Sequence, residues 1–235
     1  MKYPLFVLFL AGFLTLACEV KPPDPNHVHF MHQSTGGNFI EDHDGVAEHP
    51  DPDYGLRTLL ENAGYTFTDN WMDDSYPTSI AEYFSNDGKG IPRDAKTAGI
   101  LLFKSCYYPI DGLTSDEALD GWKQAYLDQI IPYALAHPTQ TLVAMPAVPY
   151  RKDDATQEQH DRARAWANWL KGEFLDECQK QSANNVTSFD MFTIWAYPDS
   201  NWIKDEYRGE DSHPNAYGSL VMADSLAAFI AELSE

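Results

Sequence analysis

A serine and a histidine near opposite ends of the chain have residue types and surroundings suited to nucleophilic catalysis. Ser34 stands in the segment HQSTGGN (32–38), and His213 stands in GEDSHPN (209–215). An imidazole held by a carboxylate takes the proton of a serine hydroxyl and so makes the serine a nucleophile. The two segments therefore predict attack on an acyl carbonyl by Ser34, with His213 as the general base.

Two neighbouring carboxylates compete to orient His213. Glu210 stands three residues before the histidine and Asp211 stands two before it. Either side chain is close enough in sequence to bond one ring nitrogen and so fix the tautomer. Acids are also favoured near the start of a helix, and a helix is predicted directly after this segment. The residue type favours Asp211, but the sequence leaves both acids open.

The glycines that follow Ser34 suggest how a developing negative charge is held. Gly36 and Gly37 permit a tight turn whose backbone N–H groups are exposed close to the nucleophile. We therefore expect the N–H of Ser34 and this turn to form an oxyanion hole.

Strands and helices alternate along the chain, which positions both segments at one edge of a sheet. Apolar runs bounded by turn residues predict strands at 28–31, 65–68, 99–103, 141–146 and 186–191. Helical spacing occurs at 54–62, 79–85, 115–136, 156–181 and 216–233. This order predicts an α/β fold in which helices cover both faces of a parallel sheet, with ligands beyond the carboxyl ends of the strands. Ser34 follows the first strand and His213 precedes the last helix, so both are expected at that edge.

Together these residues resemble the SGNH (GDSL-like) hydrolases, which carry the nucleophilic serine just after the first strand and an Asp-x-x-His pair just before the last helix. The resemblance implies a three-layer α/β/α sandwich with a mainly parallel, five-stranded, flavodoxin-like sheet, and it implies esterase activity. Here HQS replaces the usual Gly-Asp-Ser, and the family spacing to His213 points to Glu210. The usual Gly-x-Asn-Asp after the third strand is missing, which leaves Ser105, Asn38 and Asn70 as candidate oxyanion donors.

The first residues predict export. A basic head at Met1-Lys2 and an apolar run over 3–16 precede Ala17-Cys18, which is the pattern of a signal peptide over 1–17. The run of about 14 residues is shorter than the roughly 20 that a membrane-spanning helix needs. The segment ending at Cys18 resembles the lipobox of bacterial lipoproteins, so we expect a lipid anchor in the periplasm, outer membrane or cell surface, with plain secretion as the alternative. A linker over 18–26 and one hydrolase domain over 27–235 follow.

Charge and aromatic residues indicate the partners. The chain has 16 basic and 36 acidic residues, a formal charge of −20, which argues against nucleic acid and polyanionic glycans. Trp195, Tyr197 and Trp202 precede the histidine segment, and such side chains stack on sugar rings at wet sites. We therefore expect removal of acetyl or similar acyl groups from a neutral or weakly charged glycan, without a cofactor.

Other readings remain open. A lipase or thioesterase would share the fold, and a glycan-binding lipoprotein with a decayed site would keep the aromatic residues. His27 and His29 alternate on one strand and precede an acidic loop (42–53), which fits a zinc-dependent hydrolase. The pairing of Cys106 with Cys178 is not decided by the sequence.

Overall fold

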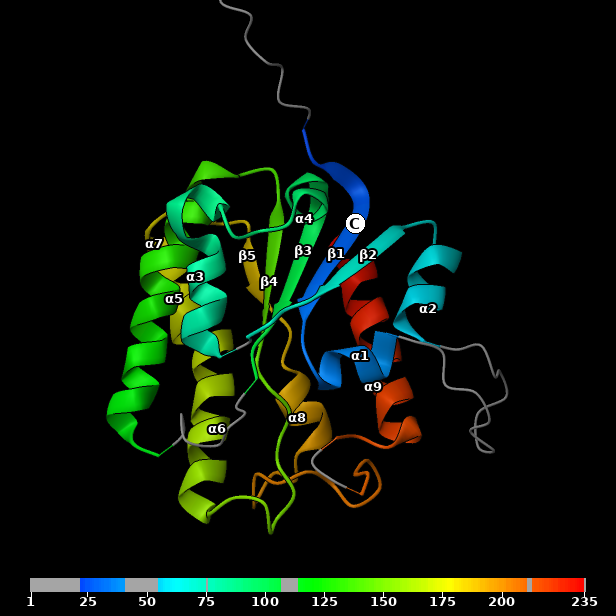
Figure 1. Cartoon of the computed structure of the whole chain (residues 1–235), viewed down its shortest axis with the longest axis vertical. Coiled ribbons are helices and arrows are strands. Elements are labelled where there is room, and N and C mark those ends of the chain that lie inside the picture. The colour runs from blue at the N-terminus through cyan, green and yellow to red at the C-terminus, as the bar shows by residue number, and fades with distance from the viewer. Residues whose placement is uncertain (1–21, 41–54, 75, 107–113, 211–212, 235) are drawn as a thin grey trace, which may run out of the picture.

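A five-stranded parallel sheet forms the centre of the protein (Figure 1). The computed structural model describes residues 22–40, 55–74, 76–106, 114–210 and 213–234. The strands run in the order β2-β1-β3-β4-β5, and all pairs are parallel. Their bounds are β1 Asp24–His32, β2 Thr66–Trp71, β3 Ala98–Lys104, β4 Thr141–Met145 and β5 Val186–Ser188.

Helices cover both faces of this sheet (Figure 1). One face carries α3 Pro77–Gly88, α4 Arg93–Thr97, α5 Asp116–Ala136, α6 Gln157–Lys171 and α7 Glu173–Lys180. The other face carries α1 Thr35–Ile40, α2 Leu56–Asn62 and α9 Ala216–Glu232, while α8 Met191–Trp195 lies between α6 and α9. The predicted three-layer α/β/α sandwich is therefore confirmed, and its flavodoxin-like strand order places the ligand edge at the carboxyl ends of the strands.

Two hydrophobic cores, one on each face, hold the layers together. Phe84, Phe103 and Trp166 belong to one core, and Phe30 and Phe39 to the other. The inner strand β3 is buried along its whole length, as expected for a parallel strand covered on both sides. Apolar side chains from one strand thus enter both cores and fix its register.

The helix predicted over 156–181 is two helices. Thr156 caps α6 with a reciprocal capping box that includes Gln159. Gly172, with φ −116° and ψ −97°, then breaks the helix before α7 begins. The short helices α1, α4 and α8 were not predicted, because five or six residues are too few for a periodic pattern.

The amino-terminal boundary also differs from the prediction. β1 begins at Asp24 and pairs with β3 there, so the last three residues of the predicted linker belong to the sheet. The signal peptide, Cys18 and the acidic loop over 42–53 lie outside the described residues. Among the helices that are described, none has the length and apolar character needed to cross a membrane.

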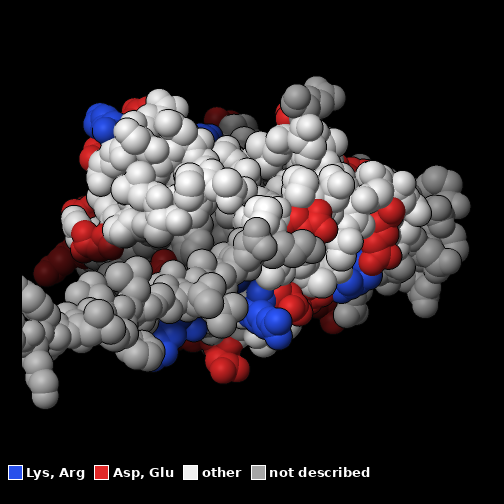
Figure 2. Space-filling model, turned by 90° about the horizontal axis from the view of Figure 1, so that it is seen from above, with Lys and Arg blue, Asp and Glu red and all other residues white. Residues whose placement is uncertain are grey.

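The two cysteines within the described residues form no disulfide between the layers. Cys106 and Cys178 are both free, and burial raises the pKa of the Cys178 thiol to about 12. On the face seen from above, acidic groups are spread in several separate places with basic groups among them (Figure 2). The charge of −20 is therefore not gathered into one acidic surface on this face.

Candidate active site

Ser34 and His213 meet at the carboxyl edge of the sheet. The Ser34 Oγ lies 2.6 Å from the His213 Nε2, although 179 positions separate the two residues in sequence. Ser34 follows β1 directly and His213 comes just before α9. Both side chains are partly exposed, so a substrate carbonyl can reach the hydroxyl that the imidazole holds.

The backbone of Ser34 is held in an uncommon conformation. Its φ of 51° lies in the left-handed region, which is unfavourable for a residue with a Cβ. Such strain is of the order of 1–3 kcal/mol and persists only where surrounding contacts fix the backbone. The residue thus forms a sharp corner between β1 and α1.

The glycines after Ser34 form the first turn of α1. The Gly36 N–H donates to the Gln33 carbonyl at 3.1 Å, and the Gly37 N–H donates to the Ser34 carbonyl at 2.9 Å. These N–H groups close the corner, so the structure does not favour them as oxyanion donors. Gly36 is required sterically, because a Cβ there would lie 2.5 Å from the His32 Cβ.

A partly buried group of charged side chains supports the end of β1 just before this corner. The His32 Nε2 lies 3.0 Å from the Asp69 Oδ2, and the Arg57 Nη2 donates to the Asp69 Oδ1 at 2.5 Å. The hydrogen bond from His32 holds the pKa of the Asp69 carboxyl below its usual value, and Arg57 adds to this effect against the opposing cost of burial. β1 is thereby tied to β2 just before the corner that carries Ser34.

Backbone hydrogen bonds fix the segment that carries His213. The Gly209 N–H donates to the His213 carbonyl at 2.8 Å, and Arg208 forms an antiparallel bridge with Pro214. Asn215 caps α9 by accepting the Gly218 N–H at 2.8 Å. The imidazole therefore projects from a closed loop that ends in a capped helix.

Of the two candidate acids, Glu210 lies within the described residues. Glu210 has an exposed side chain, and its carbonyl accepts a hydrogen bond from the Arg151 Nη1. Arg151 is itself paired with Asp154. Asp211 lies outside the described residues. The orientation of His213 by either acid thus stays a prediction.

The structure separates the remaining oxyanion candidates. Ser105 is fully buried, and both its N–H (3.1 Å) and its hydroxyl (3.3 Å) donate to the Met145 carbonyl. The Asn70 amide bonds the His29 ring and the Trp71 carbonyl, while Asn38 is half-buried in α1. Ser105 and Asn70 therefore have structural roles. The Ser34 N–H and Asn38 remain predicted donors.

The predicted sugar-binding aromatic residues also differ in exposure. Trp195 has no exposed surface, and its Nε1 donates to the Gly218 carbonyl at 2.9 Å, so it belongs to the core and cannot stack on a ligand. Tyr197 is half-buried, with a hydroxyl that accepts the Asp205 N–H. Trp202 is half-buried with Lys152 over its ring.

Sequence reasoning missed one exposed aromatic residue beside Ser34. Trp71 ends β2 and is 60% exposed. Its ring packs edge-on against His32, with centroids 5.7 Å apart, and lies 3.7 Å from the position that a Cβ on Gly37 would occupy. The signal available in the sequence was its place three residues after the strand predicted over 65–68, on the side of the ligand edge.

The two candidate metal-ligating histidines of β1 both bond a threonine of β2. The His27 Nε2 and the His29 Nδ1 both bond the Thr68 hydroxyl, at 2.7 and 2.8 Å. Within the described residues, no group of three or more His, Cys, Asp or Glu side chains is placed to hold a metal ion. Burial lowers the pKa of His29, as expected for a neutral side chain between strands.

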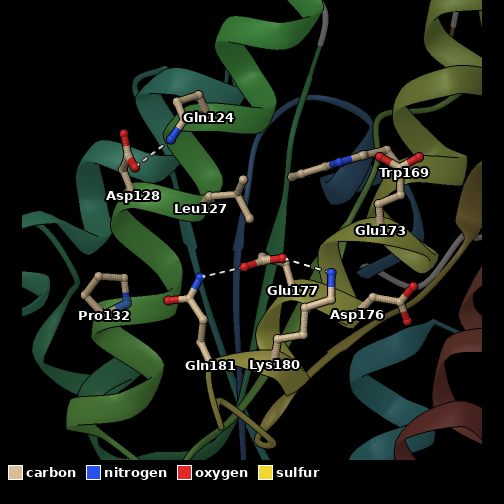
Figure 3. Close-up of a pocket in the computed structure, with 10 residues that line it drawn as sticks. All are labelled: Gln124, Leu127, Asp128, Pro132, Trp169, Glu173, Asp176, Glu177, Lys180 and Gln181. Carbon is tan, nitrogen blue, oxygen red and sulfur yellow. Dashed lines mark hydrogen bonds and ion pairs between the residues drawn. The ribbon is translucent and has the colours of Figure 1, made fainter.

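A pocket of about 620 Å³ lies elsewhere, between α5 and α7 (Figure 3). Its polar side chains mostly bond one another: Glu177 contacts Lys180 and Gln181, and Gln124 donates to Asp128. The helices that line it cover the face of the sheet opposite to α1 (Figure 1). This pocket is therefore separate from the Ser34 edge.

Solved structures share this fold, although neither a protein-family model nor a curated protein matches the chain. A proposed acylhydrolase from Bacteroides fragilis has 14% identity and a TM-score of 0.59, with 92% of this chain and 93% of that chain covered. A GDSL-like lipase from Bacteroides thetaiotaomicron has 12% identity and a TM-score of 0.56, with 89% of each chain covered. A family two carbohydrate esterase from Clostridium thermocellum, in complex with cellohexaose, has 14% identity and a TM-score of 0.57, with 91% of this chain and 65% of that chain covered. At these identities the likeness shows the fold.

Proposed function

We propose that the protein is a serine esterase, a carboxylic ester hydrolase with Ser34 as nucleophile. The observation that carries this proposal is the 2.6 Å contact between the Ser34 Oγ and the His213 Nε2 at the carboxyl edge of the sheet. The fold, shared with an acylhydrolase, a lipase and a carbohydrate esterase, adds support. Fold alone would not decide the chemistry, because one fold hosts many functions.

The reaction follows from the geometry of this pair. The serine hydroxyl donates to Nε2, so a neutral His213 carries its own proton on Nδ1. When Oγ attacks the ester carbonyl, the hydroxyl proton passes to Nε2 and a tetrahedral oxyanion forms, which the Ser34 N–H stabilises. The imidazolium then returns its proton to the leaving alcohol, and an acyl-enzyme remains. Water, activated by His213, attacks the acyl-enzyme and releases the carboxylic acid. No step requires a cofactor.

The triad acid in this proposal is Asp211. An acid must accept the Nδ1–H of His213 to hold the tautomer that the reaction needs. Glu210 has an exposed side chain and a carbonyl bonded by Arg151, which supports the choice of its neighbour. Asp is also the commoner residue in this role.

The proposed substrate is an acetylated or similarly acylated glycan of low charge. The structural neighbour with bound cellohexaose is a carbohydrate esterase, and Trp71 offers an exposed aromatic ring near Ser34. Trp202 and Tyr197 remain partly exposed candidates for a longer ligand. The formal charge of −20 disfavours polyanionic polymers as substrates.

The proposed location is outside the cytoplasm. The pattern at 1–17 supports export, and Cys18 supports a lipid anchor at the periplasmic, outer-membrane or cell surface. Metabolic labelling with a fatty-acid analogue tests the anchor, since Cys18→Ser should abolish incorporation. Incorporation retained in the variant would contradict it.

Labelling with a fluorophosphonate tests the nucleophile, because this reagent reacts with activated serines. We expect one adduct, on Ser34, and loss of both labelling and chromogenic acetate hydrolysis in Ser34→Ala. Removal of a triad nucleophile typically lowers kcat by several orders of magnitude.

A matched control separates catalysis from backbone strain. Ser182 is exposed and also has a positive φ, 69° against 51° for Ser34. Ser182→Ala should keep labelling and turnover. Hydrolysis at the wild-type rate by Ser34→Ala would exclude the proposed mechanism, and a wild-type protein that neither labels nor hydrolyses any ester would favour a glycan-binding protein with a decayed site.

A further inference from the structure

Lys104 is a fully buried lysine at the carboxyl end of β3. It has no exposed surface, and its Nζ donates to the Ser105 carbonyl at 3.2 Å and, over a longer distance of 3.5 Å, to the Gln33 carbonyl. Among the described residues it forms no ion pair. Burial of an amine with two backbone carbonyls as partners is unfavourable for stability, so its position calls for a role in the adjacent site.

The Gln33 carbonyl belongs to the same peptide group as the Ser34 N–H. A peptide group is planar and almost always trans, so its C=O and N–H point in opposite directions. A donor that fixes the direction of the Gln33 carbonyl therefore also fixes the direction of the Ser34 N–H. That N–H is the oxyanion donor in the proposed reaction.

Two contacts hold the carbonyl of this peptide group, and a third holds the Gln33 side chain. The Gln33 carbonyl accepts from Lys104 and, at 3.1 Å, from the Gly36 N–H. The Gln33 side chain donates to the Asp73 carbonyl at 3.1 Å, in the loop after β2. Ser34, with its φ of 51°, would otherwise rotate toward a more favourable backbone conformation. The contact from Lys104 comes from β3, whereas the other two come from α1 and from the loop after β2.

We propose that Lys104 is a positioning residue that aims the Ser34 N–H at the developing oxyanion. This inference rests on the proposed esterase function. Donation by the amine also polarises the Gln33–Ser34 peptide group and makes its N–H a stronger donor. An interaction of this kind acts on the transition state more than on the bound ester, so its loss lowers kcat and leaves KM nearly unchanged.

Lys104→Met tests the inference, because methionine fills similar space and removes the donor. Removal of an oxyanion donor costs about 10²–10³ in kcat, and misdirection of a donor that is still present should cost less, on the order of 10–100-fold. We expect that loss in kcat, a KM that stays close to the wild-type value, and a melting temperature that is not lowered. The Ki of a trifluoromethyl ketone, which forms a tetrahedral adduct with the serine, should rise by the same factor as kcat/KM falls.

Two further variants make the result decisive. Lys204→Met is the matched control, since the Lys204 Nζ also donates to a backbone carbonyl, that of Ile194, at 2.9 Å; it should keep the wild-type kcat and Ki. Lys104→Gln retains a shorter donor and should have a kcat between those of Lys104→Met and the wild type. It also serves as the test protein if the methionine variant does not fold.

The outcomes separate this inference from the function it rests on. If the wild type hydrolyses the acetate and Ser34→Ala does not, while Lys104→Met matches Lys204→Met in kcat and Ki, Lys104 has no positioning role. The inference is also overturned if both Lys104 variants lose stability equally without a rise in Ki. If the wild type and Ser34→Ala have equal rates, the proposed esterase function itself fails.

Discussion

Addition of one methyl group at Gly36 should disrupt the corner that carries Ser34. A Cβ on this residue would lie 2.5 Å from the His32 Cβ, 2.9 Å from its Cγ and 3.0 Å from its Nδ1. Carbon atoms in contact lie about 3.5–4.0 Å apart, so β1 and α1 must separate by about 1 Å. His32 cannot easily turn away, because its Nε2 is bonded to Asp69.

The structure gives the size of the expected effect. Overpacking of this kind costs about 1–3 kcal/mol in the free energy of unfolding. A displacement of about 1 Å would lengthen the 2.6 Å contact between Ser34 and His213 beyond hydrogen-bonding distance. Misplacement on that scale lowers rates by about 10²-fold. Gly36→Ala should therefore be less stable and nearly inactive.

Gly37→Ala is the neighbouring control. Its Cβ would lie 3.7 Å from Trp71 and 3.8 Å from His32, which are ordinary contacts. The added methyl group restricts the unfolded chain, so we expect a stability gain of about 0.4–1 kcal/mol. Urea unfolding and kcat for chromogenic acetate, corrected for the folded fraction, measure both variants. Equal stability and activity for the two alanine variants would refute the packing argument.

Three further predictions concern the substrate, the ion pair and the triad acid. Trp71→Ala should raise KM for an acetylated oligosaccharide about fivefold to tenfold, equivalent to about 1–1.4 kcal/mol, without raising KM for chromogenic acetate. Leu135→Ala, at an exposed apolar residue of α5, should change neither KM value. If steady-state kinetics show that Trp71→Ala raises KM equally for both substrates, the role of Trp71 is disproved. The folded-state pKa of Asp69 is depressed. Its contribution to the free energy of unfolding is therefore complete above the pKa of an unfolded carboxyl, about 3.9, and is lost as the pH falls through the lower pKa of the folded state. Asp69→Asn should thus be less stable than the wild type at neutral pH by about 1–2 kcal/mol, and urea unfolding across the acid range should show the difference shrink; a constant difference would contradict the assignment. Asp211→Asn should lower kcat by about four orders of magnitude, while Glu210→Gln should have a mild effect. Kinetics on both variants, with circular dichroism as the folding control, test this prediction. A larger loss of kcat in Glu210→Gln than in Asp211→Asn would make Glu210 the triad acid.

The strand and helix order was predictable because each long element carries its own local signal. The five predicted strands all appear, with ends shifted by a few residues, since apolar runs in a covered parallel sheet are continuous. The helix break at Gly172 was not predicted, because the four-residue apolar spacing continues from Leu170 to Phe174 across it. Local pattern thus predicts that elements exist, while their ends depend on backbone conformation.

The candidate site was predictable only in part, because exposure depends on tertiary packing. Ser34 and His213 were predicted from the edge that each segment occupies, and the structure brings them together. Trp195 and Trp71 are the same residue type, yet one is buried and the other is 60% exposed. The neighbouring sequence does not distinguish the two tryptophans, because their exposure is set by tertiary packing. Trp195 is covered by α9, and Trp71 lies at the end of the edge strand β2.

Four unfavourable features of the structure lie at or next to the corner that carries Ser34. Ser34 has a left-handed backbone, Lys104 is buried without an ion pair among the described residues, and within the same residues the His32 Nδ1 and the Thr35 hydroxyl are buried without a hydrogen-bond partner. Each feature lowers stability by an amount on the order of 1 kcal/mol or more. Comparable features also occur elsewhere in the described residues: Asn86, Asp87, Ser182 and Asn201 have positive φ, and the Tyr126 hydroxyl and the His160 Nδ1 are buried without a hydrogen-bond partner. Local choices that oppose stability are expected where the geometry serves another purpose, and in the proposed reaction the four at this corner would serve to direct the Ser34 hydroxyl and its own N–H at one carbonyl.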